Sequence, residues 1–409
     1  MGKITILGTG LTRSKKPGMA IPAVVLFEQF LLLNTGNAIQ IIGVDDLEAV
    51  TKNKQNILSS DIIIINSLST LLNNGSELLL KLLRKKKVFL YLHETEYVLD
   101  YSDKYYQQRM SIFWRSLPNI GLLCSTQQQQ DFYHRLGLTN TSVIFNSLNL
   151  NPAYTWQRDR VLSEDIHVVM IGSIQKRKGV VLFDQVANIL TQTNPRYKFT
   201  WIGGHTDRED GDYKFSKCVK WIERISAEDI YDIYSQADVF FLSSIDDPLP
   251  LSATEAAAAG LRVVAYEGTG THETLSGCNG FVAFSTYSPE HASEAIIKVI
   301  SNHPKSTDYS KVSVLFASKH FAVNAWRAIS DLVDRVPSFT CDEDFQSTLR
   351  RLEANNDIIQ SPLLTAYGLP TEIFLEYATK YQSQINLEII SKKVKTITEG
   401  YAGQISPIY

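Results

Sequence analysis

Two carboxylate residues bracket the start of a helix in the second half of the chain. Asp247 follows an apolar segment at 237–242, and Glu255 lies in the first turns of a small-residue helix that Gly260 ends. The free backbone amides and the positive dipole end of such a helix start form an anion site. Carboxylates instead accept hydrogen bonds from hydroxyl groups. Together these groups fit a ligand that carries both phosphates and hydroxyls, such as a nucleotide sugar.

The same carboxylates also have a purely structural interpretation. An acidic residue near a helix start is often a cap or a partner of the helix dipole. Here, however, the helix lies between two apolar segments, at 237–242 and 261–266, that predict strands of a parallel sheet. Ligand sites in open parallel sheets lie at the carboxyl ends of strands. This placement puts the ligand-binding hypothesis on an equal footing with the structural one.

A basic loop offers a second anion site. Lys176, Arg177 and Lys178 follow the strand predicted at 166–172 and precede the helix predicted at 180–190. Cations next to a helix N-terminus are repelled by its dipole unless an anion lies among them. A diphosphate fits this combination of cations and free amides, and a solvated basic turn is the alternative.

The first half of the chain offers two weaker candidates. Gly10 ends a Gly-Thr-Gly turn after the first predicted strand, but Arg13 stands where a dinucleotide-binding fingerprint needs its third glycine. An oxidoreductase is therefore a weak hypothesis. The loop after Gly10 either closes on phosphates or on an acceptor, or is a mobile surface loop. His93 follows the apolar strand at 88–92, where parallel sheets place functional side chains, although a lone histidine is commonly structural.

Length and composition indicate a globular protein with more than one domain. The chain has 409 residues, of which 44% are hydrophobic and 20% charged, and its formal net charge is −3. This length suggests two large domains, and the near-neutral charge argues against general nucleic-acid binding. The four cysteines have no metal-ligand or redox spacing, and neither a signal peptide nor a membrane span is evident. A cytoplasmic location is the simplest prediction.

Alternation of short apolar segments with amphipathic helices divides the chain into two α/β halves. The alternation runs through 1–150 and again through 166–315, and a polar linker that contains a proline joins them at 151–165. It predicts two parallel sheets covered by helices, with a ligand cleft between the halves. An amphipathic crossover helix at 316–337 and a helical extension at 338–409 follow, and we interpret the extension as a packing or oligomerisation appendage. The predicted strands are 4–7, 39–44, 62–66, 88–92, 121–124, 142–145, 166–172, 199–204, 219–222, 239–242, 263–266 and 281–282.

The motifs of the second half resemble the retaining glycosyltransferases of GT-B fold, the large family 4 group also described as glycosyl transferases group 1. The resemblance covers residues 166–285, whereas the first half matches only in its strand pattern, in His93 and in Asn146. The matching elements are Lys178-Gly179, Tyr234-Ser235-Gln236-Ala237-Asp238, the Glu-x7-Glu element in the form of Asp247 and Glu255, Gly268-Thr269-Gly270-Thr271-His272-Glu273, and Gly280-Phe281-Val282.

The resemblance implies a fold and an activity. The fold is α/β, of GT-B type, with two Rossmann-like domains facing a cleft and a helical C-terminal appendage. The activity is transfer of a sugar from a nucleotide-diphosphate sugar to a hydroxyl of a glycan, glycolipid or protein acceptor, with the anomeric configuration retained. Neither a metal nor a cofactor is expected beside the nucleotide sugar substrate, and polysaccharide biosynthesis is a suitable setting.

The resemblance also implies roles for individual residues. Lys178 would bind the donor diphosphate and stabilise the departing nucleotide, Asp247 would contact sugar hydroxyls, and His93 would lie near the transferred sugar and the acceptor. Glu255 would hold the ribose hydroxyls. The remaining expected donor-binding residues are Leu251 and Ser252, through their amides, and Ser173, Arg177 and Gly10.

Three positions depart from the family pattern. Ser173 stands where the family carries an arginine, so one phosphate-binding cation is missing unless Arg177 or Arg13 substitutes. Asp247 is one methylene shorter than the usual glutamate, and Pro250 lacks the amide of a glycine often found there. These departures support an alternative: a catalytically silent GT-B subunit that binds or stabilises a partner glycosyltransferase. An epimerase or a phosphorylase on the same fold is a further alternative.

The expected partners are the nucleotide sugar and the acceptor, without nucleic acid. No metal site is expected, because Asp210-Gly211-Asp212 and Asp342-Glu343-Asp344 lie in polar stretches away from the strand ends. We interpret the leucine- and lysine-rich run at 78–87 as a core-facing helix with cations at its C-terminal end. Peripheral contact with the inner face of a membrane and homo-oligomerisation through the C-terminal helices stay open.

Overall fold

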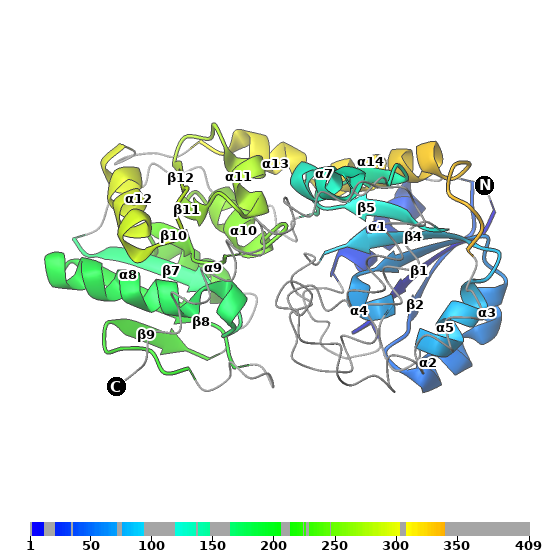
Figure 1. The fold of residues 1–409 in the computed structure, drawn as a ribbon, viewed down its shortest axis with the longest axis horizontal. Coiled ribbons are helices and arrows are strands. Elements are labelled where there is room, and N and C mark those ends of the chain that lie inside the picture. Colours follow the sequence, from blue (N-terminus) through cyan, green and yellow to red (C-terminus); the bar gives the residue numbers. More distant parts are fainter. Residues whose placement is uncertain are drawn as a thin grey trace. The chain divides into compact units, whose positions relative to one another are not determined.

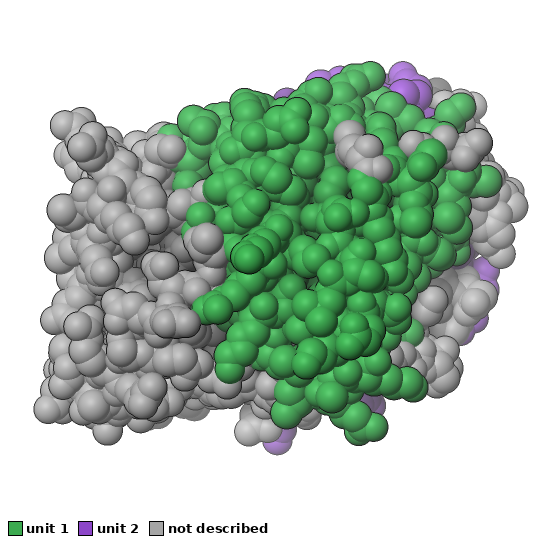
Figure 2. Space-filling model, turned by 90° about the vertical axis from the view of Figure 1, so that its right-hand side faces the viewer, with its two compact units in different colours: residues 1–147, 317–391 green, residues 148–316, 392–409 purple. Residues whose placement is uncertain are grey.

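The protein forms two compact units, which a computed structural model describes at residues 2–11, 21–33, 36–71, 76–93, 119–135, 138–147, 164–205, 213–223, 225, 229–245, 247–302 and 308–339. The first unit contains the described residues of Met1–Ser147 together with those from Ala317 onward, and the second those within Leu148–Phe316. Figure 1 shows their elements, and Figure 2 shows one face of the first unit in space-filling form. Most of the predicted linker and nearly all of the predicted C-terminal extension lie outside the described residues.

A six-stranded parallel sheet forms the first unit, with the strand order β2-β1-β3-β4-β5-β6. Its adjacent inner strands β1 and β3 are rich in isoleucine and are buried along their whole length. Such continuous burial is expected for parallel strands covered on both faces. The strands are β1 (Ile4–Gly8), β2 (Ile39–Gly43), β3 (Ile62–Asn66), β4 (Lys87–Leu92), β5 (Gly121–Cys124) and β6 (Thr141–Val143).

Helices between these strands turn their apolar sides to the sheet. In α5, the leucines at 79 and 83 are buried, whereas Lys81 is exposed, as is Arg84 directly after the helix, which is the pattern predicted for a core-facing helix. Asp46 caps α2 by accepting a hydrogen bond of 2.8 Å from the amide of Ala49. The helices are α1 (Ile21–Leu32), α2 (Leu47–Lys52), α3 (Lys54–Leu58), α4 (Leu68–Leu71), α5 (Ser76–Leu83) and α7 (Gln127–Arg135).

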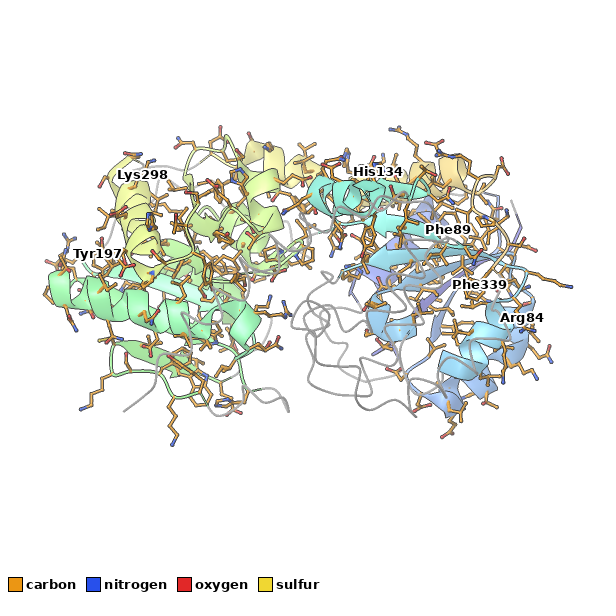
Figure 3. All side chains as sticks on the ribbon, viewed as in Figure 1. Arg84, Phe89, His134, Tyr197, Lys298 and Phe339 are labelled. Carbon is orange, nitrogen blue, oxygen red and sulfur yellow. The ribbon has the colours of Figure 1, made fainter. Side chains whose placement is uncertain are left out.

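Helix α14 (Ser318–Leu332) follows the second unit in sequence but packs in the core of the first. The ring of Trp326 meets Phe30 of α1 edge-on at 5.4 Å, and Phe321 lies 5.8 Å from Tyr91 of β4. Beyond the helix, Phe339 and the Lys85–Lys86 turn exchange two backbone hydrogen bonds of 2.9 Å. Phe339, Phe89 and Arg84 are labelled in Figure 3. The chain therefore returns to its first unit to complete that core.

The second unit contains another six-stranded parallel sheet, in the order β12-β11-β10-β7-β8-β9. Phe183 of α8 anchors its core, with ring centroids 5.3 Å from Trp201 and 5.5 Å from Phe199. Figure 3 labels two residues away from the site, Tyr197 at the start of β8 and the exposed Lys298 of α12. The strands are β7 (Ile166–Ile171), β8 (Tyr197–Ile202), β9 (Val219–Ile222), β10 (Val239–Leu242), β11 (Arg262–Tyr266) and β12 (Phe281–Phe284). The helices are η4 (Lys176–Lys178), α8 (Val180–Thr193), α9 (Asp229–Gln236), α10 (Leu251–Ala258), α11 (Gly270–Leu275), α12 (Pro289–Asn302) and α13 (Ser310–Leu315).

The α/β prediction is confirmed for both halves. Each predicted strand is a strand of one of the two parallel sheets, and the differences lie at strand ends, as in β8, which begins two residues before its predicted start. Apolar periodicity indicates where a strand lies, but the first and last residues of the strand are set by its backbone hydrogen bonds to neighbouring strands. The strand order and direction thereby establish at which edge of each sheet the carboxyl ends of the strands lie. The predicted site residues come after these strand ends in the sequence.

Candidate active site

Three loops at the carboxyl edge of the second sheet are joined into one structure. The amide of Ile245, after β10, donates to the carbonyl of Arg177, after β7, at 3.0 Å. The hydroxyl of Ser243 donates to the carbonyl of Lys178 at 2.8 Å. The amide of Gly270, after β11, donates to the carbonyl of Asp247 at 2.9 Å. The loops after β7, β10 and β11 therefore present their side chains together, as the ends of parallel strands do.

An ion pair between Lys178 and Asp247 forms the centre of this site. Lys178 Nζ contacts Asp247 Oδ2, and Arg177 Nη1 lies 3.8 Å from the same oxygen. Asp247 is only 6% exposed, so solvent screens these charges less than it screens a surface pair. Two cations face one carboxylate, so positive charge is in excess within this group of three side chains. That excess suits an anionic ligand.

Close packing at Gly179 explains why a glycine follows Lys178. Gly179 is the N-cap of α8 and has a left-handed backbone with φ of 69°. A β-carbon at this position would come within 1.8 Å of the carbonyl oxygen of Ser243. The hydroxyl of Tyr287 donates to that same carbonyl at 2.7 Å. The glycine thus allows the η4 turn to lie directly against the end of β10, which brings Lys178 to Asp247.

Helix α10 supplies the second carboxylate and two free amides. Leu251 and Ser252 are its first residues, so their amides have no acceptor within the helix. The buried Tyr234 of α9 holds this turn by donating its hydroxyl to the carbonyl of Ser252 at 3.1 Å. Glu255 lies one turn further on, and burial raises the pKa of its carboxyl group to about 7. Its protonation therefore changes within the physiological range.

Polar side chains that were not predicted as site residues also lie at this edge. Ser244 Oγ, Thr271 Oγ1 and His272 Nδ1 are buried and have no hydrogen-bond partner among the residues that the structure describes. Ser244 follows β10, and Thr271 and His272 belong to the first turn of α11. Since buried polar groups are normally hydrogen-bonded, these atoms are candidates to bind ligand hydroxyls. The sequence signal was the threonine- and glycine-rich turn after β11, which was quoted only as a family motif.

The loop after β7 contains a glutamine that sequence reasoning missed. Gln175 Nε2 donates to Ser173 Oγ at 2.9 Å, and Arg177 Nε donates to Gln175 Oε1 at 2.9 Å. Gln175 is 9% exposed. Its residue type carries no distinctive signal, because a glutamine in a basic loop is usually a solvated side chain. Only the folded loop reveals that it connects two predicted donor-binding residues.

His93 lies at the carboxyl edge of the first sheet. Its Nε2 is 2.9 Å from Oδ1 of Asn66, and its ring centroid is 4.1 Å from that of Tyr91. Burial lowers the pKa of His93 to about 3, so the imidazole is neutral near pH 7. The residue can therefore take part in hydrogen bonding without adding a charge.

Gly10 also belongs to the first unit. Its backbone is left-handed, with φ of 77°, and its amide donates to the carboxylate of Asp45, which follows β2. The amide is thus already engaged by a carboxylate. The other predicted site residues, from Ser173 to Glu255, belong to the second unit.

Several predicted features lie outside the described residues. They include Arg13, the alternative substitute for the missing arginine, and both Asp-x-Asp sequences. Over the part of the chain that is described, no group of three or more histidine, cysteine, aspartate or glutamate side chains is arranged to hold a metal ion. No helix within that part combines the length and the apolar composition that a membrane span requires.

Comparison with known proteins agrees with this architecture. Residues 155–313 match the family described as glycosyl transferases group 1. A sucrose-phosphate synthase from Thermosynechococcus elongatus is 16% identical, with a TM-score of 0.57 and coverage of 87% of this chain and 100% of that chain. HepE from Anabaena, in complex with UDP and glucose, is 15% identical, with a TM-score of 0.58 and coverage of 81% and 100%. The trehalose-6-phosphate synthase OtsA is 11% identical, with a TM-score of 0.55 and coverage of 81% and 98%.

At these identities the structural likeness establishes the fold. The chain has the GT-B fold, and the segment that matches the group 1 glycosyltransferases lies within its second unit and contains the Lys178–Asp247 site. The predicted fold is therefore confirmed, and the match and the fold together support a glycosyltransferase. No curated protein matches the chain in sequence.

Proposed function

We propose that the protein is a retaining glycosyltransferase of the family 4 type. It moves a sugar from a nucleotide-diphosphate sugar to a hydroxyl of a glycan, glycolipid or protein acceptor. The observation that carries the proposal is the buried contact of Asp247 with Lys178 and Arg177 beside the free amides of α10. Since HepE binds UDP and glucose, UDP-glucose is the first donor to test.

The chemistry follows from where negative charge develops. When the bond between the sugar's anomeric carbon and the β-phosphate oxygen breaks, the leaving nucleotide gains negative charge. Lys178, Arg177 and the amides of Leu251 and Ser252 are the groups that stabilise this charge. The acceptor hydroxyl attacks on the face that the phosphate leaves and passes its proton to the phosphate. The configuration of the sugar is retained, and no metal or further cofactor takes part.

The carboxylates and His93 have hydrogen-bonding roles in this proposal. Asp247 holds both cations at the phosphate and accepts from a sugar hydroxyl with its other oxygen. Glu255 accepts from the ribose hydroxyls, and it does so best when its carboxyl group is ionised, above the raised pKa of about 7. His93 remains neutral because burial lowers its pKa. It therefore orients the sugar or the acceptor by hydrogen bonding. A cytoplasmic setting in polysaccharide biosynthesis, at or near a membrane face, is consistent with these roles.

The first experiment is a thermal-shift screen of UDP, GDP, ADP, CMP, dTDP and their sugars. A ligand that binds only the folded protein raises its melting temperature. We expect one nucleotide class to stabilise the wild type but not the Lys178→Ala variant. Lys198→Ala is the matched control, because this lysine is exposed on β8, where its Nζ donates to the carbonyl of Pro195 at 2.8 Å and lies 3.8 Å from Asp165. If no nucleoside diphosphate stabilises the wild type, the proposed function is wrong.

A second candidate is a catalytically silent subunit. The observation that favours it is the direct contact between Asp247 and Lys178, which engages the main phosphate-binding cation with a carboxylate of the protein itself. Turnover separates the two functions. Transfer or hydrolysis of the donor that Lys178→Ala abolishes supports the enzyme, and donor binding without either reaction supports the silent subunit. The anomeric configuration of the product, read by NMR, tests retention.

A further inference from the structure

We propose that Gln175 is a positioning residue that directs Arg177 to the donor diphosphate and thereby supplies the cation missing at position 173. The inference rests on the proposed function of the same site and adds to it a residue and a mechanism. Gln175 does not itself contact the donor. It acts through Ser173 and Arg177, to which its side-chain amide is hydrogen-bonded on either side.

The orientation of the Gln175 amide is set by its partners. Arginine can only donate hydrogen bonds, so the group that faces Arg177 Nε at 2.9 Å must be the Oε1 acceptor. The Nε2 donor then faces Ser173 Oγ at 2.9 Å. Since Ser173 Oγ accepts this bond, its own hydroxyl hydrogen is available for another acceptor, such as a phosphate oxygen. One amide thus orients a hydroxyl donor and a guanidinium at once.

The bond through Nε matters because of the shape of the guanidinium. Arginine has five N–H donors in a planar fork, and the terminal nitrogens carry four of them. Holding the side chain by Nε fixes the plane of the fork and leaves the terminal nitrogens to bind other groups. Nη1 lies 3.8 Å from Asp247 Oδ2, the oxygen that also contacts Lys178. Arg177 is therefore directed to the same place as Lys178.

The backbone around Gln175 is held well enough for this role. The amide of Ile174 donates to the carbonyl of Gly204 at 3.0 Å, and the carbonyl of Arg177 accepts from Ile245 at 3.0 Å. The carbonyl of Gln175 accepts from the amide of Lys178 at 3.0 Å, which closes the η4 turn. With the backbone hydrogen-bonded at these points and Gln175 only 9% exposed, the remaining freedom is in the Arg177 side chain, which is 24% exposed. The Gln175 bond restricts that freedom.

A double-mutant cycle on nucleotide binding tests the role. The variants are Gln175→Met, which preserves size without hydrogen bonding, Arg177→Ala, and the pair, and the readout is the Kd for UDP, GDP and ADP by calorimetry. We expect Gln175→Met to weaken binding of the nucleotide that the wild type binds by about 3- to 10-fold, and Arg177→Ala by about 10-fold. The loss in the double variant should be smaller than the sum of the two single losses, because the part of the Gln175 effect that passes through Arg177 is already absent in Arg177→Ala.

Two controls separate positioning from general damage. Gln40→Met removes a comparable glutamine of the first unit, whose amide donates to Thr5 Oγ1 at 2.6 Å, and we expect it to leave the Kd unchanged. Gln175→Glu keeps an acceptor for Arg177 but adds negative charge near the diphosphate. It should weaken binding more at low ionic strength than at high ionic strength. If Gln175→Met does not fold, Gln175→Glu tests the positioning role in its place.

The outcomes distinguish this inference from the proposed function. If the wild type binds none of the three diphosphates, the proposed function fails and the positioning role fails with it. If the wild type binds one and Arg177→Ala weakens it, but Gln175→Met does not, the site stands and the role of Gln175 is overturned. Additive losses in the double variant also overturn it, because they mean that Gln175 acts independently of Arg177.

Discussion

The carboxyl edges of the two sheets differ in charge. In the second unit, Asp247, Lys178 and Arg177 meet at the edge, and burial raises the pKa of Glu255 into the physiological range. In the first unit, the edge carries neutral polar groups and the carboxylate of Asp45, which the amide of Gly10 contacts. His93, with its pKa lowered by burial, lies beside Asn66, and Thr9 donates its amide to Thr70 Oγ1 at 3.2 Å.

This difference in charge indicates that the edges of two similar sheets suit two different kinds of ligand. A diphosphate needs compensating cations, which only the second edge provides among the residues that the structure describes around these strand ends. A sugar or an acceptor hydroxyl needs hydrogen-bond donors and acceptors, and the neutral side chains of His93 and Asn66 at the first edge offer them. The comparison predicts that changes at the second edge affect donor binding strongly, whereas changes at the first edge affect turnover and leave nucleotide binding intact.

The largest expected effect is that of Lys178→Ala. Removing this cation takes away the charge that stabilises the leaving phosphate and leaves the carboxylate of Asp247 with only the more distant Arg177. We expect kcat/KM to fall by about 100-fold or more. Steady-state kinetics with the donor identified by thermal shift measure this, and Lys198→Ala is the control. A fall of less than about 3-fold would mean that the charged edge is not the donor site.

Gly179→Ala should disturb the second edge through its backbone. The new methyl group would come within 1.8 Å of the Ser243 carbonyl, and the φ of 69° is itself unfavourable for alanine. We expect a loss of about 2–4 kcal/mol in the free energy of unfolding, measured by urea denaturation. Gly277→Ala is the matched control, because its φ is 79° and nothing lies within 4 Å of the added carbon. It should cost only about 1 kcal/mol, and equal losses would contradict the packing explanation.

Glu255→Gln should remove a pH dependence. The pKa is about 7 in the folded protein and 4.5 in the reference state. Burial therefore penalises the ionised form, and the wild type loses stability relative to the variant as pH rises from about 4.5 to about 7. Donor binding should show the opposite trend, since the ionised carboxylate is the better acceptor for ribose hydroxyls. We expect kcat/KM at pH 8 to fall by about 10-fold in the variant.

The measurements for Glu255 are melting temperatures and kcat/KM between pH 5 and 8. A wild-type profile that the glutamine variant reproduces would show that another group titrates. Asp232→Asn, at an exposed position of α9, is a suitable control for the loss of a carboxylate outside the site.

His93→Gln should have the smallest effect. With a folded pKa of about 3, the histidine is neutral across the activity range, so the variant should keep the shape of the pH–rate profile. We expect kcat to fall by about 3- to 10-fold, while the Kd for the nucleotide stays within about 2-fold. Because the folded pKa lies below the ordinary 6.5, the wild type should lose stability relative to the variant as pH falls from about 6.5 towards 3. A large change in nucleotide affinity would contradict the division of roles between the two edges.

The sequence by itself determined the fold class and predicted where the candidate site lies. Apolar segments of strand length, repeated with helices between them, indicate parallel sheets because strands buried on both faces must be apolar throughout. Lys178, Asp247 and Glu255 could be named in advance because they follow such segments, and ligands bind at those strand ends. These signals are local, so they can be recognised in the sequence without knowledge of the tertiary contacts.

Only the tertiary structure decided how these residues are used. Lys178 and Asp247 are 69 positions apart, and their contact depends on the close approach of Gly179 to the end of β10. Gln175 has an ordinary residue type, and its role comes from the two side chains that the folded loop places beside it. Helix α14 was predicted as a crossover helix, but its partners in the first unit, Phe30 and Tyr91, became known only from the packing. The pKa values of Glu255 and His93 depend on burial, which no local pattern specifies.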